Sequence, residues 1–181
     1  MTETMQSPPY TLGADEQVAQ VMAYTNTSLY WGEVIVKEMI RVSTWLRTNT
    51  APDRICLYNA KAISSTSTAP TRPMQFRELH LAASQVLAFH LVPPARDPLD
   101  YDTTEPNRFM QPVTILIGNI RVDGKLRLST RSNLAKFLEV TREQFSSVYE
   151  AQISNPSSPA FGSISVPYVL VRQEAGVFTL P

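Results

Sequence analysis

The first and second halves of the chain place their apolar and polar residues in the same order. Residues 32–46 align without a gap on residues 124–138, with glycine on glycine, alternating apolar positions on alternating apolar positions, and tryptophan on phenylalanine. A shift of one residue then places residues 57–60 on residues 148–151, so that the pattern Tyr-x-Ala recurs as well. A burial pattern that repeats in the same order predicts two copies of one structural unit.

Apolar alternation rich in β-branched and aromatic residues predicts strands in both copies. Each copy also contains a short helix. In the first copy Val42, Trp45 and Leu46 follow the i, i+3, i+4 spacing, and in the second Ser132 caps residues 133–140. We expect a mainly β protein, with α+β as the alternative, in which each copy is a small sheet or partly open barrel with one short helix. The expected strands are residues 29–37, 54–63, 86–92, 113–120, 122–128, 145–153, 164–172 and 177–180, and helical structure also fits residues 14–22 and the first part of 76–92.

Changes of composition divide the chain into four segments. Residues 1–12 are polar and should form a flexible tail, and residues 93–112, rich in proline and acidic residues, should form a linker. The two copies then occupy residues 13–92 and 113–181. Because units of this size bury little core alone, we expect them to pack on each other or on a second chain.

Two glycines and one proline carry local predictions about the strands. Gly32 and Gly124 hold the same place in the two copies, which predicts a bulge or bend that a side chain would obstruct. Asp123 before Gly124 also suits a tight turn. Pro167 favours an edge position for its strand, because proline has no N–H to donate to a neighbour.

Composition and charge narrow the classes of function. The formal net charge is zero, so no overall field draws the protein to nucleic acid or anionic lipid, and only 18% of residues are charged. This share lies below the usual value of about 25% and leaves room for an apolar association surface. The chain starts without a basic and apolar leader, and no stretch approaches the ~18 apolar residues of a membrane helix. We therefore expect a cytoplasmic protein without a membrane partner.

The segment 40–46, Ile-Arg-Val-Ser-Thr-Trp-Leu, resembles part of an uncharacterised family of small bacterial β-rich domains. The core of that family runs glycine, alternating strand, then Arg-Leu-Ser-Asp-aromatic-Leu-Asn. The first copy keeps the arginine and serine as Arg41 and Ser43, and the second keeps the glycine as Gly124 and the aromatic-leucine pair as Phe137-Leu138. The resemblance implies a β-rich fold and a bacterial origin, and it implies no activity.

A row of basic residues is the most suggestive candidate site. On a strand over residues 125–131, alternate side chains face the same way, so a cationic face would lie opposite buried Leu126 and Leu128. Such a face predicts binding of nucleic acid or another polyanion, although an ordinary solvated strand face weighs more because no aromatic residues alternate with the basic ones. The acidic linker can fold over this face, but a plain solvated linker is the preferred interpretation. The anion-binding candidates are Lys125, Arg127 and Arg131, with Arg121 and Lys136 nearby.

The chain shows no pattern typical of catalysis, metal binding or cofactor binding. Cys56, the only cysteine, lies in an apolar run and is expected to be a buried, inert thiol. His80 and His90 lack metal-ligand spacing and are expected to be packed and hydrogen-bonded. No glycine-rich phosphate loop or nucleophile motif occurs. We therefore predict no catalytic residues, no metal and no cofactor, and a hydrolase with dispersed residues is the weakest alternative.

The adjacent aromatic residues Tyr30 and Trp31 point to opposite faces of their expected strand, so one of them is a candidate for a protein interface. Trp45 and Phe137, which align between the copies, are expected in the core. The duplication, the low charge and the lack of reactive clusters together predict a non-enzymatic interaction or scaffold protein. We expect it to bind a protein partner or to associate with itself.

Overall fold

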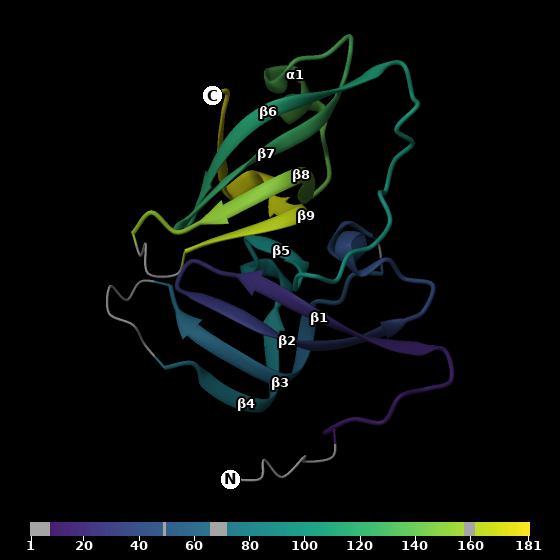
Figure 1. The fold of residues 1–181 in the computed structure, drawn as a ribbon, viewed down its shortest axis with the longest axis vertical. Helices are drawn as coiled ribbons and strands as arrows, with labels where there is room; N and C mark the ends of the chain where they lie inside the picture. Colours follow the sequence, from purple (N-terminus) through teal and green to yellow (C-terminus); the bar gives the residue numbers. More distant parts are fainter. Residues whose placement is uncertain (1–7, 49, 66–71, 158–161) are drawn as a thin grey trace.

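Ten strands form one antiparallel sheet in the computed structural model, which describes residues 8–48, 50–65, 72–157 and 162–181 (Figure 1). The strand order is β10-β6-β7-β8-β9-β5-β1-β2-β3-β4, and β10 and β4 form the two ends of the sheet. The sheet does not close into a barrel. The prediction of a mainly β protein is therefore confirmed.

The first half of the chain supplies one block of five neighbouring strands, in the order β5-β1-β2-β3-β4. A short 3-10 helix, η1, follows β2, and a second one, η2, precedes β5. The elements are β1 (Glu16–Tyr24), β2 (Ser28–Lys37), η1 (Val42–Arg47), β3 (Arg54–Ser64), β4 (Met74–Ala82), η2 (Ala83–Gln85) and β5 (Ala88–Leu91).

The second half supplies the other block, in the equivalent order β10-β6-β7-β8-β9. Its short helix, α1, takes the place of η1, and η4 takes the place of η2. This shared order is what a duplicated unit predicts, although common origin itself stays a prediction. The elements are β6 (Arg108–Ile117), β7 (Ile120–Ser129), α1 (Leu134–Val140), β8 (Phe145–Ser154), β9 (Ser163–Arg172), η4 (Gln173–Ala175) and β10 (Gly176–Thr179).

The two blocks meet at β5 and β9 in the middle of the sheet (Figure 1). Two residue pairs form this junction, Ala88 with Val171 and Phe89 with Leu170. By their place in the two blocks, β10 is the equivalent of β5, and β4 is the equivalent of β9. The junction pairs β5 with β9. The equivalent strands β10 and β4 are left unpaired on one side, at the two ends of the sheet.

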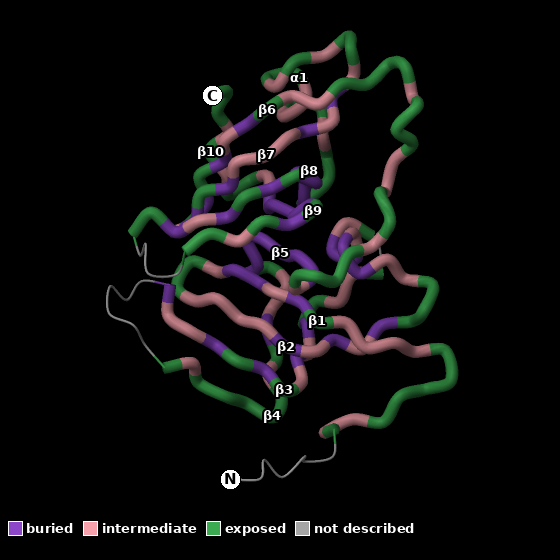
Figure 2. The backbone as a smooth tube through the Cα atoms, in the orientation of Figure 1, coloured by how far each residue is buried: buried purple, intermediate pink, exposed green. Residues whose placement is uncertain are grey.

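Both hydrophobic cores contain residues from both halves. The core under the first block includes Trp45, as expected, together with Phe145 and Leu170 from the second half. The core under the second block includes Leu87 from the first half, and Phe137 packs against it partly buried. The burial is densest along the central strands (Figure 2). The halves therefore pack on each other through shared cores.

Gly32 and Gly124 lie at bulges, as their repeated position predicts. The register shifts between Trp31 and Glu33 and again at the equivalent place in β7, while the turn between β6 and β7 lies at residues 118–119. Opposite each glycine, one residue adopts a positive φ: Asn59 at 47° and Glu150 at 48°. The bulges bring the two backbones so close that only glycine fits.

We expect the Gly124→Ala variant to lose about 1–3 kcal/mol of unfolding free energy, the usual cost of overpacking. A Cβ at this position would lie 2.6 Å from Cγ1 of Val148 and 2.9 Å from the carbonyl oxygen of Tyr149. Urea denaturation measures the loss. Gly13→Ala is the matched control, because its Cβ would meet only the flexible end of Glu16. Equal stability of the two variants would show that the bulge tolerates a side chain.

Several expected elements differ from those observed. A helix was expected over residues 14–22, but residues from Glu16 onward form strand β1, because β1 pairs with β2 on one side and with β5 on the other. The first part of residues 76–92 is likewise strand, in β4, and β6 begins at Arg108, inside the expected linker. Asn133, not Ser132, caps α1 by accepting a hydrogen bond from the backbone N–H of Lys136.

Two further differences concern the tail and Pro167. Residues 1–7 of the expected tail lie outside the described residues, but Tyr10 donates a hydrogen bond to Glu33 (2.9 Å) and its ring packs against Tyr58. Strand β9, with Pro167, lies between β8 and β5 and not at an edge. Because β5 pairs only with the end of β9, Pro167 needs no N–H on that side.

Candidate functional site

The alternation predicted for the basic strand is present in β7. Leu126 and Leu128 are buried, and the cationic side chains between them lie on the other face. The strand ends at Ser129, however, so Arg131 lies in the following turn, and Lys136 lies in α1. Of the three cations predicted to share one strand face, only Lys125 and Arg127 therefore lie on the strand.

The cationic groups on β7 are paired with acids of the same chain. The carboxylates come from the linker, from β7 itself and from the bulge of β8, and those of the linker and of β8 are distant from their partners in the sequence. Three of the five candidate charges are thereby neutralised locally, which weakens the attraction of the surface for a polyanion. The pairs are Arg121 with Asp123 (2.8 Å), Lys125 with Glu150 (2.5 Å) and Arg127 with Glu105 (2.5 Å).

The acidic linker folds onto the protein, which differs from the preferred interpretation of a plain solvated segment. Glu105 contacts Arg127, and the guanidinium of Arg127 also stacks on Tyr101, with Cζ 4.6 Å from the ring centroid. The hydrogen bond from Arg127 holds the pKa of Glu105 below its ordinary value. The linker thus forms a polar cover over one side of β7.

The same linker fastens the two halves to each other. Asp97 accepts hydrogen bonds from the backbone N–H and the hydroxyl of Ser43, at 2.9 and 2.5 Å. Asp100 accepts from Arg47 of the first half (3.1 Å) and from the hydroxyl of Tyr149 of the second half (2.8 Å). Burial and the bond to Asp100 raise the pKa of Tyr149, so this hydroxyl stays a donor. We interpret this network as structural, because each polar group already has its partner.

The predicted interface pair, Tyr30 and Trp31, is split between two environments. Tyr30 packs against the first core, whereas Trp31 belongs to neither core, although both side chains are only partly exposed. The prediction that this pair forms an interface stays a prediction. More exposed apolar residues on the edge strands β4 and β10 are Met74, Phe76 and Val177.

A hollow of about 740 Å³ lies between the two halves and brings together basic and acidic side chains. The charged residues that line it include Arg47, Arg142, Arg172, Glu143 and Glu174, and neither histidine is among its lining residues. The hydrolase alternative required a pocket that gathers a histidine with acids. This hollow does not provide one, and that alternative stays a prediction without a site.

His90 is packed and hydrogen-bonded, as expected. Its Nδ1 donates to the carbonyl oxygen of Leu91 (2.7 Å), which leaves Nε2 to accept from the hydroxyl of Tyr24 (3.0 Å). Burial lowers the pKa of His90 to about 4. The imidazole is therefore a neutral part of the core at physiological pH.

The exposure of His80 and Cys56 differs from what the sequence predicted. His80 is exposed on β4, and Cys56 is partly exposed on β3, because strand alternation turns Ile55 and Leu57 into the core and Cys56 outward. Cys56 and His80 are directly opposite each other across the β3–β4 pair. Glu78 lies two residues before His80 and so shares its face.

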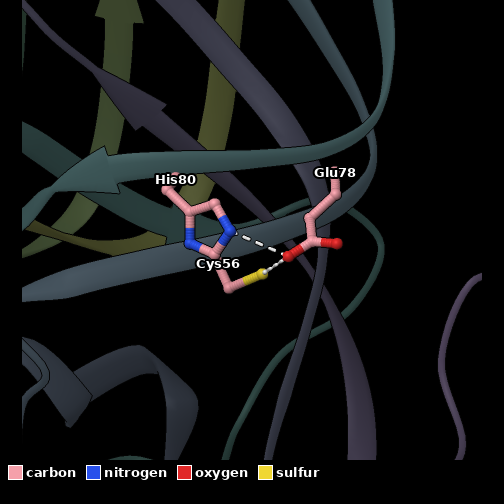
Figure 3. Close-up of side chains that lie close together, drawn as sticks. All are labelled: Cys56, Glu78 and His80. Carbon is pink, nitrogen blue, oxygen red and sulfur yellow. Dashed lines mark hydrogen bonds and ion pairs between the residues drawn. The ribbon is translucent and has the colours of Figure 1, made fainter.

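These three side chains form a cluster on the outer surface of the sheet (Figure 3). The thiol of Cys56 donates to Oε1 of Glu78 at 3.6 Å, and Nε2 of His80 lies 2.8 Å from the same oxygen. All three ligand atoms lie within 4.8 Å of one another. Thiol, imidazole and carboxylate are the groups that bind zinc in proteins, so the cluster is a candidate metal centre that the sequence analysis missed.

The comparisons with known proteins add no assignment. No family model, curated protein or solved structure matches this chain. The resemblance of residues 40–46 to a bacterial β-rich family therefore stays a prediction. In the part of the chain that the structure describes, no helix is long and apolar enough to cross a membrane.

One signal for the cluster was present in the sequence. Glu78-x-His80 has the period of two that places both side chains on one face of a strand. The third member, Cys56, is 22 residues before Glu78 (78 − 56), and only the register of β3 against β4 shows that they meet. The expectation of a helix in this region hid the pattern.

Proposed function

We propose that this protein is a non-enzymatic association module that binds further copies of itself through the two open edges of its sheet. The observation that carries the proposal is the internal junction of β5 with β9. The chain there pairs the same two structural positions that β10 and β4 occupy at the open ends. Pairing β10 of one molecule with β4 of the next would repeat a contact that this fold already makes.

The register of the proposed contact follows from the repeat. The strand pairs β3–β4 and β8–β9 align β4 on β9 at an offset of 90 residues (171 − 81). The junction residues Leu170 and Val171 therefore correspond to His80 and Leu81 on the open edge. We place β10 of the neighbouring molecule antiparallel to this end of β4.

The composition of the open edges supports association. Unpaired strand edges are templates for pairing unless charge, proline or a bulge protects them. Strand β4 is exposed over most of its length (Figure 2), and β10 presents the exposed side chain of Val177. Leu180 follows β10 and is exposed as well. Val177 and Leu180 would lose water on pairing, which adds to the backbone hydrogen bonds.

A contact of this kind is heterologous, since two different edges meet. Repetition of such a contact produces a ring when the rotation closes and a filament when it does not. The internal junction adds a stabilising contact, from Arg172, that the open edge lacks, because the equivalent position on β4 is Ala82. The contact between molecules should accordingly be weaker than the junction and should depend on protein concentration.

Size-exclusion chromatography with light scattering over a range of concentrations tests the proposal. We expect masses that rise from 20.2 kDa towards multiples of it as the concentration increases. Val177→Lys, at a side chain that is 60% exposed on β10, should return the protein to a monomer by placing a charge on the edge. Val140→Lys, at a 58% exposed position on α1, is the matched control and should leave association unchanged.

Two results would contradict the proposal. A parent protein that stays at 20.2 kDa at every concentration does not self-associate. Association that Val177→Lys leaves intact uses a surface other than the β10 edge.

A further inference from the structure

Cys56, Glu78 and His80 are partly or fully exposed potential metal ligands that lie close together among the described residues, and the proposed association uses none of their side chains. We propose that they bind zinc, or a similar thiophilic divalent cation, in an open three-ligand site on the outer face of β3 and β4 (Figure 3). The site and the edge contact are separate proposals, because coordination uses side chains on a face of the sheet and association uses the backbone at its edge.

The backbone places the three ligands together. Cys56 and His80 are a directly opposed cross-strand pair, which brings their Cβ atoms to about 4.5–5.5 Å. Glu78 precedes His80 by two residues and therefore points to the same side of β4. Two paired strands hold the ligands without a loop, so binding does not require a disordered segment to fold.

The distances suit tetrahedral coordination. Zinc bonds of about 2.0–2.3 Å to nitrogen, oxygen and sulfur place neighbouring tetrahedral ligands about 3.3–3.8 Å apart. The sulfur of Cys56 lies 3.6 Å from Oε1 of Glu78, inside this range. Nε2 of His80 lies 2.8 Å from the same oxygen, so a metal ion needs to spread this pair by less than 1 Å. All three ligand atoms lie within 4.8 Å of one another, which rotation of the exposed side chains can adjust.

The ligand types select the class of metal. A thiolate and an imidazole favour zinc and related transition metals, whereas magnesium and calcium take oxygen ligands almost alone. The carboxylate of Glu78 accepts hydrogen bonds from the thiol of Cys56 and from Nε2 of His80. A cation bound between the three side chains would take the place of the two protons in these hydrogen bonds. Burial, together with the nearby charge of Glu78, raises the pKa of the Cys56 thiol. Metal binding therefore has to displace the thiol proton.

Three protein ligands leave a fourth position open. The side chains of Glu78 and His80 are about half exposed, so this position faces solvent. Water can occupy it, and so can a donor from another molecule. Open positions of this kind distinguish accessible zinc sites from closed structural ones.

Titration with Co²⁺ followed by competition with Zn²⁺ tests the site, because cobalt reports thiolate ligation by a charge-transfer band and tetrahedral geometry by its visible bands. We expect one equivalent of Co²⁺ per chain, displaced by Zn²⁺. Cys56→Ser should abolish the charge-transfer band, and Glu78→Gln and His80→Gln should each weaken binding at least about tenfold, since loss of even an outer-shell partner costs about 10–100-fold. Glu139→Gln, which removes an exposed carboxylate on α1, is the control and should bind like the parent.

The same titration on the Val177→Lys variant separates the two proposals. We expect unchanged metal binding by this variant whether or not the parent associates. The metal site is refuted if stoichiometric Co²⁺ produces no thiolate band, or if Cys56→Ser binds as tightly as the parent. Far-ultraviolet circular dichroism confirms that the variants, all at partly or fully exposed positions, retain the fold.

Discussion

We expect the Arg172→Met variant to lose about 3–4 kcal/mol of unfolding free energy. The guanidinium of Arg172 is buried at the junction of the halves, where Nε donates to the carbonyl oxygen of Val86 (2.8 Å) and a terminal nitrogen donates to that of Ala83 (2.7 Å). Without these donors the carbonyl of Val86 loses this partner, whereas that of Ala83 keeps the backbone N–H of Val86 (3.1 Å). Hydrogen bonds from a charged donor contribute about 1.5–3 kcal/mol. The stacking of the guanidinium on Phe145 contributes about 1 kcal/mol more.

Denaturation with urea measures this loss, and two variants separate its causes. Arg172→Lys keeps the charge but cannot reach both carbonyls in the same planar fork, so its stability should lie between that of the parent and Arg172→Met. Arg142→Met removes an exposed arginine that lines the same hollow and should change stability by less than about 0.5 kcal/mol. A methionine variant as stable as the parent would show that packing alone holds the junction.

Acid is expected to destabilise the protein through His90, by about 3 kcal/mol between pH 7 and pH 4. Burial lowers the pKa of this imidazole from 6.5 to about 4 in the folded state. As the pH falls below 6.5, the unfolded chain takes up a proton at His90 that the folded protein does not bind, so the folded state loses relative stability. The loss levels off below pH 4, where the folded protein is protonated as well. The difference between a pKa of 6.5 and one of about 4 corresponds to about 3 kcal/mol.

The unfolding free energies of the parent and of His90→Gln at pH 7, 5.5 and 4 isolate this effect, because the other titrating groups are common to both proteins. We expect the difference in unfolding free energy between the parent and the variant to change by about 3 kcal/mol, to the disadvantage of the parent, as the pH falls from 7 to 4. Glutamine does not titrate, but its amide can still bond to Tyr24 or to the carbonyl of Leu91. A constant difference between the two proteins would mean that His90 is not held neutral by burial.

Local features of the fold, such as the bulges, were largely predictable from the sequence. The bulges at Gly32 and Gly124 were predictable because the requirement for glycine is set by a close approach that recurs in both copies. Residues 14–22 were assigned wrongly because Val18, Val21 and Met22 fit a helical spacing as well as a strand. Pairing with β2 and β5 decides between the two, and neither partner is visible within that segment.

The candidate sites were less predictable than the strands. The expected cationic face of β7 carries less net positive charge than predicted, because Glu105 and Glu150 form ion pairs with Arg127 and Lys125. Both acids are distant from β7 in the sequence. Cys56 was expected to be buried from the apolar run around it, but a residue between two inward-facing positions of a strand points outward. Its meeting with Glu78 and His80 depends on the strand register.

By itself, the sequence determined the β class, the repeated order of the elements and the place of the bulges, since all three follow from the alternation of burial and from local backbone requirements. The tertiary structure alone decided that β5 pairs with β9, that the linker is clamped to both halves, and that a thiol, an imidazole and a carboxylate share one surface. Those features depend on contacts between residues that are distant in the chain. The energies of such contacts are set by which strands become neighbours, and a one-dimensional pattern does not encode that choice.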